Sequence, residues 1–382
     1  MASIETAAVH AGERRPGPEG SLVFPIYQGT VYQSRSGESY DEIQYLRMST
    51  TPSQEYLADK LAELEQGEAA VATASGMAAI SATLLSVLRA GDHLLVANVL
   101  YGGTASLLAK FADRLGWTYT FVDPQQPGTW QDALTPRTKA LYVETISNPL
   151  IRVSRVREVA DFCRRHGLVS IVDNTFASPV NLRPIRLGFD LVLHSATKYL
   201  GGHSDLVAGC VVGRADLVRQ VRATQNLFGG SLDPHTGFLL ARGIKTLGVR
   251  VRQQNANAGA IARFLAARPE VAEVHYPGLP GHPDHEYAAG LLDGFGGMLS
   301  FRLVGGERAV DALFDALRLP YVAPSLGGVE TTITKPAVTS HASVGADHRA
   351  RIGLPDDLVR LSCGIEAADD LVADFEQALS KI

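Results

Sequence analysis

Short apolar runs alternate with stretches of helical spacing through the middle of the chain, and this alternation limits the folds open to it. The runs have the length of buried strands and cover residues 94–97, 119–122, 140–144, 169–173 and 191–194. Helical stretches such as 77–89 and 156–165 lie between them. Apolar strands separated by helices predict a mainly parallel sheet with helices on both faces. Ligands bind such sheets beyond the carboxyl ends of the strands.

The N-terminal stretch has a different texture. Residues 1–50 contain few periodic elements, and helical spacing begins only with Leu57, Leu61 and Leu64, followed by Gly67 as a stop. An irregular stretch of this length is either disordered or wraps another structure, such as a neighbouring subunit. We therefore separate residues 1–50 as an N-terminal arm.

The pattern changes again after Leu247. A long helical stretch leads into a smaller set of expected strands at residues 271–275, 298–303 and 358–363, with helices near 308–317 and 367–379. This arrangement predicts an α/β domain over residues 51–247 and a smaller C-terminal α/β domain over residues 248–382.

Composition narrows the function classes. The net charge is -5 and no Lys/Arg-rich run stands out, so the charge pattern gives no argument for nucleic acid. Cys163, Cys210 and Cys363 are too widely spaced for a disulfide framework or a CxxC metal site. Residues 1–12 lack the layout of a signal peptide, and no apolar run approaches the roughly 20 residues of a membrane helix. We expect a soluble, cytoplasmic protein without a metal.

Two polar features stand where expected strands end. Ser75, Gly76 and Met77 precede a helix, whose first backbone amides could cradle an anion, although a simple Ser cap explains the pattern equally. Asp173 ends the strand 169–173 and could hold a protonated ring nitrogen or cap the following turn.

Two cationic residues add to these features. Lys198 follows the strand 191–194 closely, with Ser195 and Thr197 before it; a partly desolvated lysine can form an imine, and hydroxyls can bind phosphate. The alternative is a solvated loop lysine. Arg360 lies within an apolar strand, where its planar fork suits either a carboxylate ligand or a structural salt bridge.

Together the four features describe one site. A phosphate cradle, a carboxylate for a ring nitrogen, an imine-forming lysine and a carboxylate-binding arginine are what a pyridoxal-phosphate enzyme needs to act on an amino acid. An aminotransferase is one rival. A rival of another class is a non-catalytic nucleotide-binding α/β protein, but neither GxxxxGK[ST] nor GxGxxG occurs, and Gly294-Phe295-Gly296 has Leu299 where the third glycine belongs.

Over nearly its whole length the chain resembles the Cys/Met-metabolism (trans-sulfuration) family of pyridoxal-phosphate enzymes. The matching motifs, in order, are Tyr45-Leu46-Arg47, Ser75 to Ala79, Tyr101 to Thr104, Glu144 with Ser147-Asn148-Pro149, Asp173-Asn174-Thr175, Ser195 to Gly202, Arg242 to Leu247, Ser325 to Gly328 and Arg360-Leu361-Ser362. The resemblance implies the type I fold of pyridoxal-phosphate transferases, like that of aspartate aminotransferase. It also implies a homotetramer, a dimer of dimers in which the active sites are shared between subunits.

The resemblance implies a role for each site residue. Lys198 would carry the cofactor as a Schiff base and then move protons between substrate carbons. Asp173 would pair with the pyridine nitrogen, Tyr101 would stack on the ring, and Asn148 would lie near the ring hydroxyl. The implied phosphate ligands are the amides of Gly76 and Met77, the hydroxyls of Ser195 and Thr197, and, from a neighbouring subunit, Tyr45 and Arg47.

The same resemblance implies the substrate-binding groups. Ser325 would lie near the imine lysine and help to position it, and Arg360 would bind the α-carboxylate of the substrate, with Asn148 beside it. The implied reaction is elimination or replacement at the β- or γ-carbon of sulfur amino acids. Cystathionine γ-lyase or γ-synthase chemistry is favoured, and the alternatives are cystathionine β-lyase, O-acyl-homoserine sulfhydrylase and methionine γ-lyase.

The chain departs from the family pattern at three places. Thr51-Pro52-Ser53 stands where the family often has Asn-Pro-Thr after the arginine. Gly103 stands where methionine γ-lyases usually have cysteine, which disfavours that activity. Pro324 stands where trans-sulfuration members often carry glutamate, and this change bears on substrate preference and not on the cofactor.

Overall fold

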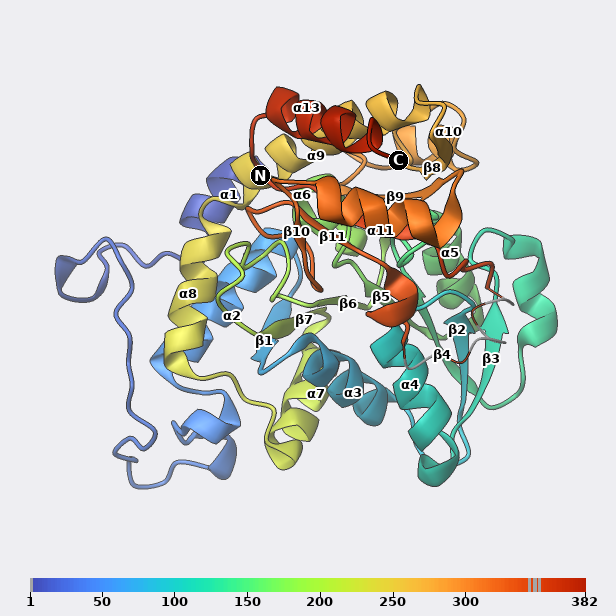
Figure 1. Ribbon diagram of the computed structural model, residues 1–382. Coiled ribbons are helices and arrows are strands. Elements are labelled where there is room, and N and C mark those ends of the chain that lie inside the picture. Colours follow the sequence, from blue (N-terminus) through green and yellow to red (C-terminus); the bar gives the residue numbers. More distant parts are fainter. Residues whose placement is uncertain (1–2, 343–344, 346–348, 350–351) are drawn as a thin grey trace.

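The apolar runs of the central region form one seven-stranded sheet (Figure 1). The computed structural model describes residues 3–342, 345, 349 and 352–382. The strands are β1 (Ala69–Thr73), β2 (His93–Ala97), β3 (Thr118–Val122), β4 (Thr138–Glu144), β5 (Val169–Asp173), β6 (Leu191–His194) and β7 (Gly209–Gly213). Their order is β1-β7-β6-β5-β4-β2-β3. β7 runs antiparallel to both of its neighbours, β1 and β6, and the pairings from β6 to β3 are parallel. The predicted mainly parallel sheet is confirmed.

Helices cover this sheet and bury its apolar side chains. They are α2 (Pro52–Glu65), α3 (Gly76–Val87), α4 (Gly102–Phe111), α5 (Val156–His166), α6 (Ser178–Asn181), α7 (Ala215–Phe228) and α8 (Pro234–Ile244). In Figure 1, α7, α3 and α4 lie side by side below the sheet, while α2 packs on β1 and on α8. Residues of β2, β4, β5 and β6 are almost wholly buried, which explains why these strands lack an alternating polar pattern.

The C-terminal part of the chain builds a second, five-stranded sheet above the first (Figure 1). Its strands are β8 (Val271–His275), β9 (Met298–Leu303), β10 (Tyr321–Val322), β11 (Thr332–Thr334) and β12 (Val359–Ser362), in the order β10-β11-β12-β9-β8. The helices α9 (Leu247–Ala266), α10 (His285–Ala289), α11 (Gly306–Ala316) and α13 (Ala368–Leu379) accompany it. A separate apolar core includes Ile261, Phe301 and Phe375. The boundary at residue 247 stays a prediction, and α9 begins there.

Some elements carry too little pattern to be expected from the sequence. β1 reads Ala-Ala-Val-Ala-Thr, in which three of the five residues are alanine, a residue depleted in strands, and β7 is bounded by glycines. β10 and β11 are only two and three residues long. In the described part of the chain, no helix is long and apolar enough to cross a membrane.

The N-terminal region is anchored at its start and then leaves the body of the molecule. The short helix α1 (Ile4–His10), unexpected from the sequence, packs against α2 and α9. Buried Lys60 of α2 donates to the carbonyl of Ala11 (2.8 Å) and pairs with Glu13 (3.5 Å), which also accepts from Tyr56 (2.7 Å) and contacts Lys245 (2.9 Å). Beyond this anchor the blue trace in Figure 1 extends away from both sheets.

Candidate active site

The carboxyl ends of β4, β5 and β6 open into a cavity of about 660 Å³, closed on its other side by residues of the second sheet. This edge is where ligands bind in parallel α/β sheets. The cavity unites most of the site residues predicted from the sequence: Gly76, Met77, Tyr101, Asn148, Asp173, Ser195, Thr197, Lys198, Ser325 and Arg360. Tyr45 and Arg47 do not line it.

Lys198 and Arg360 meet at one residue, Ser325. The Lys198 Nζ donates to Ser325 Oγ (2.6 Å), and Arg360 Nη2 donates to the Ser325 carbonyl (3.0 Å). Burial and the nearby Arg360 charge lower the pKa of Lys198 to about 8. A larger share of the amine is therefore neutral near pH 7 than in a solvated lysine, and a neutral amine is the form that attacks carbonyl carbon.

The Ser325 backbone has an unusual conformation. Its φ is +78°, in the left-handed region that residues other than glycine seldom adopt. Such backbone strain clusters at ligand sites, where the surrounding contacts hold it in place. Here the two hydrogen bonds to Lys198 and Arg360 are those contacts.

Asp173 lies in the cavity beside a second buried carboxyl group. Its Oδ1 accepts from the backbone amide of Thr175 (3.0 Å) and from Thr175 Oγ1 (2.5 Å), a pairing foreshadowed by the Asp-Asn-Thr sequence. Glu144 faces Asp173 in the register of β4 and β5. Burial raises the pKa of both groups; the Asp173 charge raises that of Glu144 further, whereas the bonds from Thr175 favour the ionised form of Asp173. Asp173 is thus the better placed of the two to carry negative charge.

The predicted phosphate cradle lies at the start of α3. Ser75 caps the helix by accepting from the Ala78 amide (3.0 Å), and the free amides of the first turn follow it. A Cβ at Gly76 would come within 2.8 Å of the Ser195 Cβ, so only glycine allows these two segments to lie so close. Thr197 Oγ1 already donates to the Ala208 carbonyl (3.1 Å), which makes Ser195 the freer of the two hydroxyls.

Tyr101 stands at the start of α4 with its backbone tied to Glu144. The Tyr101 amide donates to Glu144 Oε1 (2.5 Å), a contact that spacing in the sequence could not indicate. A side chain at Gly103 would collide with the Tyr101 ring and with Met77 Sδ. Gly103 therefore makes room for the tyrosine ring at the cavity wall.

Asn148 is held against the substrate side of the cavity. Arg360 is 3% exposed, and its Nη1 donates to Asn148 Oδ1 (3.0 Å). Burial lowers the pKa of Arg360 to about 10, and the guanidinium still carries its charge at neutral pH. No carboxylate of the described residues pairs with it, so the salt-bridge alternative is not what the structure contains.

Tyr45 and Arg47 lie outside the cavity of their own chain. Arg47 donates to the Asn226 carbonyl (3.1 Å) and to Tyr40 Oη (3.2 Å), and it also lies over the Tyr45 ring. Two parts of the cavity lining could not be assigned from the sequence: Glu144 belongs to a family motif that gives it no role, and Thr339 and Ser340 belong to no motif. The latter two residues come from a loop of the second sheet with no strand pattern beside it.

The residues present fit pyridoxal phosphate. The same cavity offers free helix amides beside Gly76 for a phosphate, a buried carboxylate for a ring nitrogen, and an amine with a lowered pKa. The Tyr101 ring at the wall provides an apolar face for an aromatic ring. The unpaired Arg360 guanidinium then remains for a substrate carboxylate.

Comparisons with known proteins agree with this site. The model of the family described as "Cys/Met metabolism PLP-dependent enzyme" matches residues 5–380. A cystathionine γ-lyase of Bacillus subtilis is 42% identical over 99% of both chains, and a cystathionine β-lyase of Lactococcus lactis is 43% identical over 100% of both. The solved cystathionine γ-synthase of Xanthomonas oryzae pv. oryzae superimposes with a TM-score of 0.95, at 41% identity, and covers 100% of this chain and 98% of its own. The expected type I fold and catalytic activity are confirmed, and the chain belongs to the Cys/Met-metabolism family of pyridoxal-phosphate-dependent enzymes.

Proposed function

We propose that this enzyme catalyses elimination or replacement at the γ-carbon of a sulfur amino acid, as a cystathionine γ-lyase or γ-synthase. The observation that supports an amino-acid substrate is the bridge through Ser325, and the choice of the γ-carbon follows the similarity to a γ-lyase and a γ-synthase. One residue joins the amine of Lys198 to the guanidinium of Arg360. A substrate bound there has its α-carboxylate near the Arg360 guanidinium, whose planar fork binds carboxylates. Its α-amine then lies near the Lys198 amine.

In this mechanism each residue has one task. Arg360, steadied by Asn148, binds the substrate α-carboxylate. Pyridoxal phosphate, when bound, supplies an electron sink for negative charge at the substrate α-carbon. Asp173 holds a proton at the ring nitrogen of the cofactor, Tyr101 stacks against the ring, and the amides of Gly76 and Met77 with Ser195 and Thr197 hold the phosphate.

Lys198 performs the proton transfers. Its amine takes the proton from the substrate α-carbon and can carry protons to and from the β-carbon. The amine needs to be partly neutral for the first step, and its lowered pKa meets that need. Loss of a γ-thiol after these transfers gives a γ-lyase. Loss of the γ-acyloxy group of an O-acyl-homoserine as a carboxylate, followed by addition of a thiol at the same carbon, gives a γ-synthase.

We further propose a homotetramer built from two active dimers, in the cytoplasm. The support is that Tyr45 and Arg47 do not line the cavity of their own chain and that the N-terminal arm extends away from both sheets before it reaches them (Figure 1). Three free, buried cysteines suit a reducing compartment.

The deciding experiment identifies the products formed from L-cystathionine by the purified holoenzyme. 2-Oxobutyrate with cysteine is the result expected of a γ-lyase. Cystathionine formed from an O-acyl-homoserine and cysteine is the result expected of a γ-synthase. Pyruvate with homocysteine as the main products would overturn the γ-assignment in favour of a β-lyase, and sulfide incorporation alone would favour a sulfhydrylase.

A further inference from the structure

The loop of residues 146–153, which follows β4, carries Asn148 and is closed at its base. Ile146 bridges Val153, the Ser147 amide donates to the Arg152 carbonyl (2.9 Å), and the Arg152 amide donates to Ser147 Oγ (3.1 Å). Just beyond, Ser154 Oγ donates to the Glu144 carbonyl (2.5 Å). These hydrogen bonds couple the two ends of the loop, so a displacement of Arg152 also displaces Ser147 and, with it, the adjacent Asn148.

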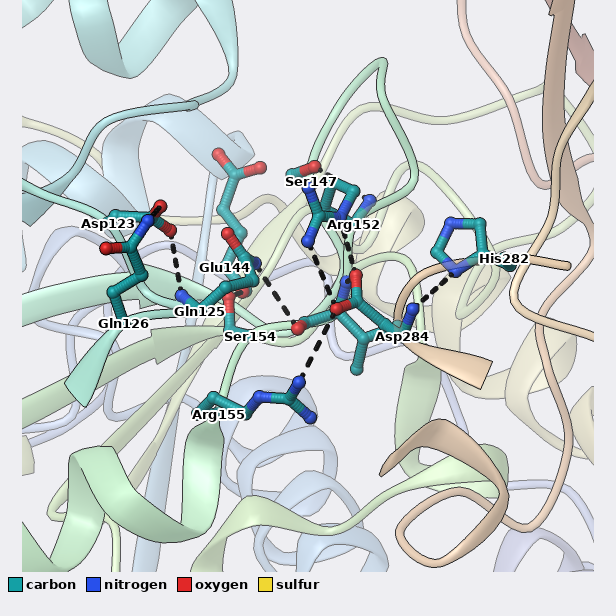
Figure 2. Close-up of polar contacts among 11 residues, drawn as sticks. Asp123, Gln125, Gln126, Glu144, Ser147, Arg152, Ser154, Arg155, His282 and Asp284 are labelled. Carbon is teal, nitrogen blue, oxygen red and sulfur yellow. Dashed lines mark hydrogen bonds and ion pairs between the residues drawn. The ribbon is translucent and has the colours of Figure 1, made fainter. Parts of the chain in front are cut away.

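Residues of the C-terminal part of the chain form hydrogen bonds and ion pairs with this loop at separate points. Ser300 of β9 donates to the Pro149 carbonyl (2.7 Å), and Arg360 of β12 donates to Asn148. The remaining contact is Asp284, just before α10, which faces Arg152 and Arg155 in Figure 2.

Asp284 is 1% exposed and is paired with several donors at once. It accepts from Arg152 Nε (2.6 Å), Arg152 Nη2 (3.2 Å) and the Val153 amide (3.0 Å), and Arg155 Nη2 lies 3.8 Å away. Its own amide donates to His282 Nδ1 (3.1 Å), which fixes its direction (Figure 2). Burial alone would raise the pKa of Asp284, but the hydrogen bonds from Arg152 and Val153 hold it below its ordinary value.

A bidentate arginine–carboxylate pair is directional as well as strong. The two bonds to Arg152 and the one to Val153 define both the position and the tilt of the loop end. The catalytic groups Lys198 and Asp173 receive no contact from Asp284, so its influence is confined to the side of the cavity formed by Asn148 and Arg360.

We propose that Asp284 is a positioning residue of the substrate-carboxylate site, which holds the Asn148 loop so that Asn148 stays hydrogen-bonded to Arg360. The proposal rests on the carboxylate-binding role proposed above for Arg360. In this proposal the contact between the two sheets contributes to substrate binding and does not only join the two parts of the chain.

The test compares Asp284→Ala and Asp284→Asn with wild type in the holoenzyme, on whichever sulfur amino acid proves to be the substrate. Asp284→Ala is expected to raise KM roughly tenfold to a hundredfold, the scale of a displaced binding group. kcat should change far less, because an α-carboxylate contact is made in ground and transition states alike. Asp284→Asn keeps one acceptor oxygen and is expected to restore part of the loss.

A second measurement avoids turnover. The dissociation constant of butyrate, a carboxylate without an amine, should rise in parallel with KM, whereas that of pyridoxal phosphate should change far less, because only Asn148 among its proposed ligands lies on this loop. Tyr287→Phe is the matched control. It removes the hydrogen bonds of the Tyr287 hydroxyl to Glu158 (2.8 Å) and from the Arg157 amide (3.3 Å) across the same boundary, and it keeps the ring under Arg155 and does not touch the Asn148 loop. Its KM should equal that of wild type.

The outcomes separate the two proposals. If Arg360→Ala weakens substrate and butyrate but the Asp284 variants do not, the role of Asp284 is wrong and that of Arg360 stands. If Arg360→Ala leaves both unchanged, the carboxylate site itself is wrong. If kcat and cofactor affinity fall in Asp284→Asn as much as substrate affinity does, the role of Asp284 is purely structural. If Asp284→Ala fails to fold, the comparison of Asp284→Asn with wild type decides between these outcomes.

Discussion

Ser325 shows how much one residue contributes to this site. Its hydroxyl accepts a hydrogen bond from Lys198 and its carbonyl accepts one from Arg360. Its left-handed backbone directs the hydroxyl and the carbonyl toward these two side chains. Two cations therefore lie close together, with only hydrogen bonds between them. Burial of the amine, and next the nearby Arg360 charge, lower the pKa of Lys198 to about 8, which is the electrostatic cost of this arrangement.

This cost predicts the pH dependence of cofactor capture. The neutral amine of Lys198 is the reacting form, so the rate at which the apoenzyme takes up pyridoxal phosphate covalently should rise with pH and level off above about 8. Stopped-flow absorbance at a series of pH values measures this midpoint. A midpoint near the value of an ordinary lysine, about 10.4, would contradict the lowered pKa.

Arg360→Met offers the matched control for that profile. Removal of the guanidinium takes away one of the two causes that lower the pKa of Lys198, and burial remains. The midpoint should therefore move upward and still lie below that of a solvated lysine. A downward shift would mean that Arg360 does not repel the Lys198 charge.

At the level of elements, the anchor between α2 and the N-terminal segment depends on one buried cation. Lys60 is fully buried and holds Ala11 and Glu13. Lys60→Ala should lower the free energy of unfolding by about 3 kcal/mol, because it leaves a cavity and an unpaired carbonyl. Urea unfolding measures the loss; Lys110→Ala, on an exposed position of α4, should stay within about 0.5 kcal/mol. Equal effects of the two changes would refute the anchor.

The elements also explain what sequence could predict. Asp173 ends one apolar strand and Lys198 follows the end of another by four residues. Parallel strands bring their carboxyl ends to one edge of the sheet, so the presence of both residues in one cavity could be predicted from local pattern. Contacts between distant positions did not follow. Tyr101 meets Glu144 across 43 residues and Arg152 meets Asp284 across 132, and no periodicity encodes such pairs. The edge strand β1 could not be predicted because most of its residues are alanine, which favours helices.

At the level of the whole molecule, the proposed sharing of sites between subunits has a direct test. Arg47→Ala and Lys198→Ala should each inactivate the enzyme alone, because one loses a phosphate contact and the other the reacting amine. If Arg47 serves a neighbouring subunit, a mixed dimer places both defects in one site and leaves the other intact. Mixing the two variants under subunit exchange should then recover part of the activity. No recovery would mean that Arg47 acts within its own chain.

The bridge through Ser325 also orders events during synthesis on the ribosome. Lys198 precedes Ser325 by 127 residues, and Asp173 and the start of α3 precede it further. A nascent chain therefore contains Lys198, whose amine reacts with an aldehyde, long before it contains Arg360, which forms a hydrogen bond with Asn148. The lysine is therefore translated well before the groups that bind the substrate carboxylate, so a chain that ends before residue 325 contains Lys198 but has neither Ser325 to position it nor Arg360 to bind a carboxylate.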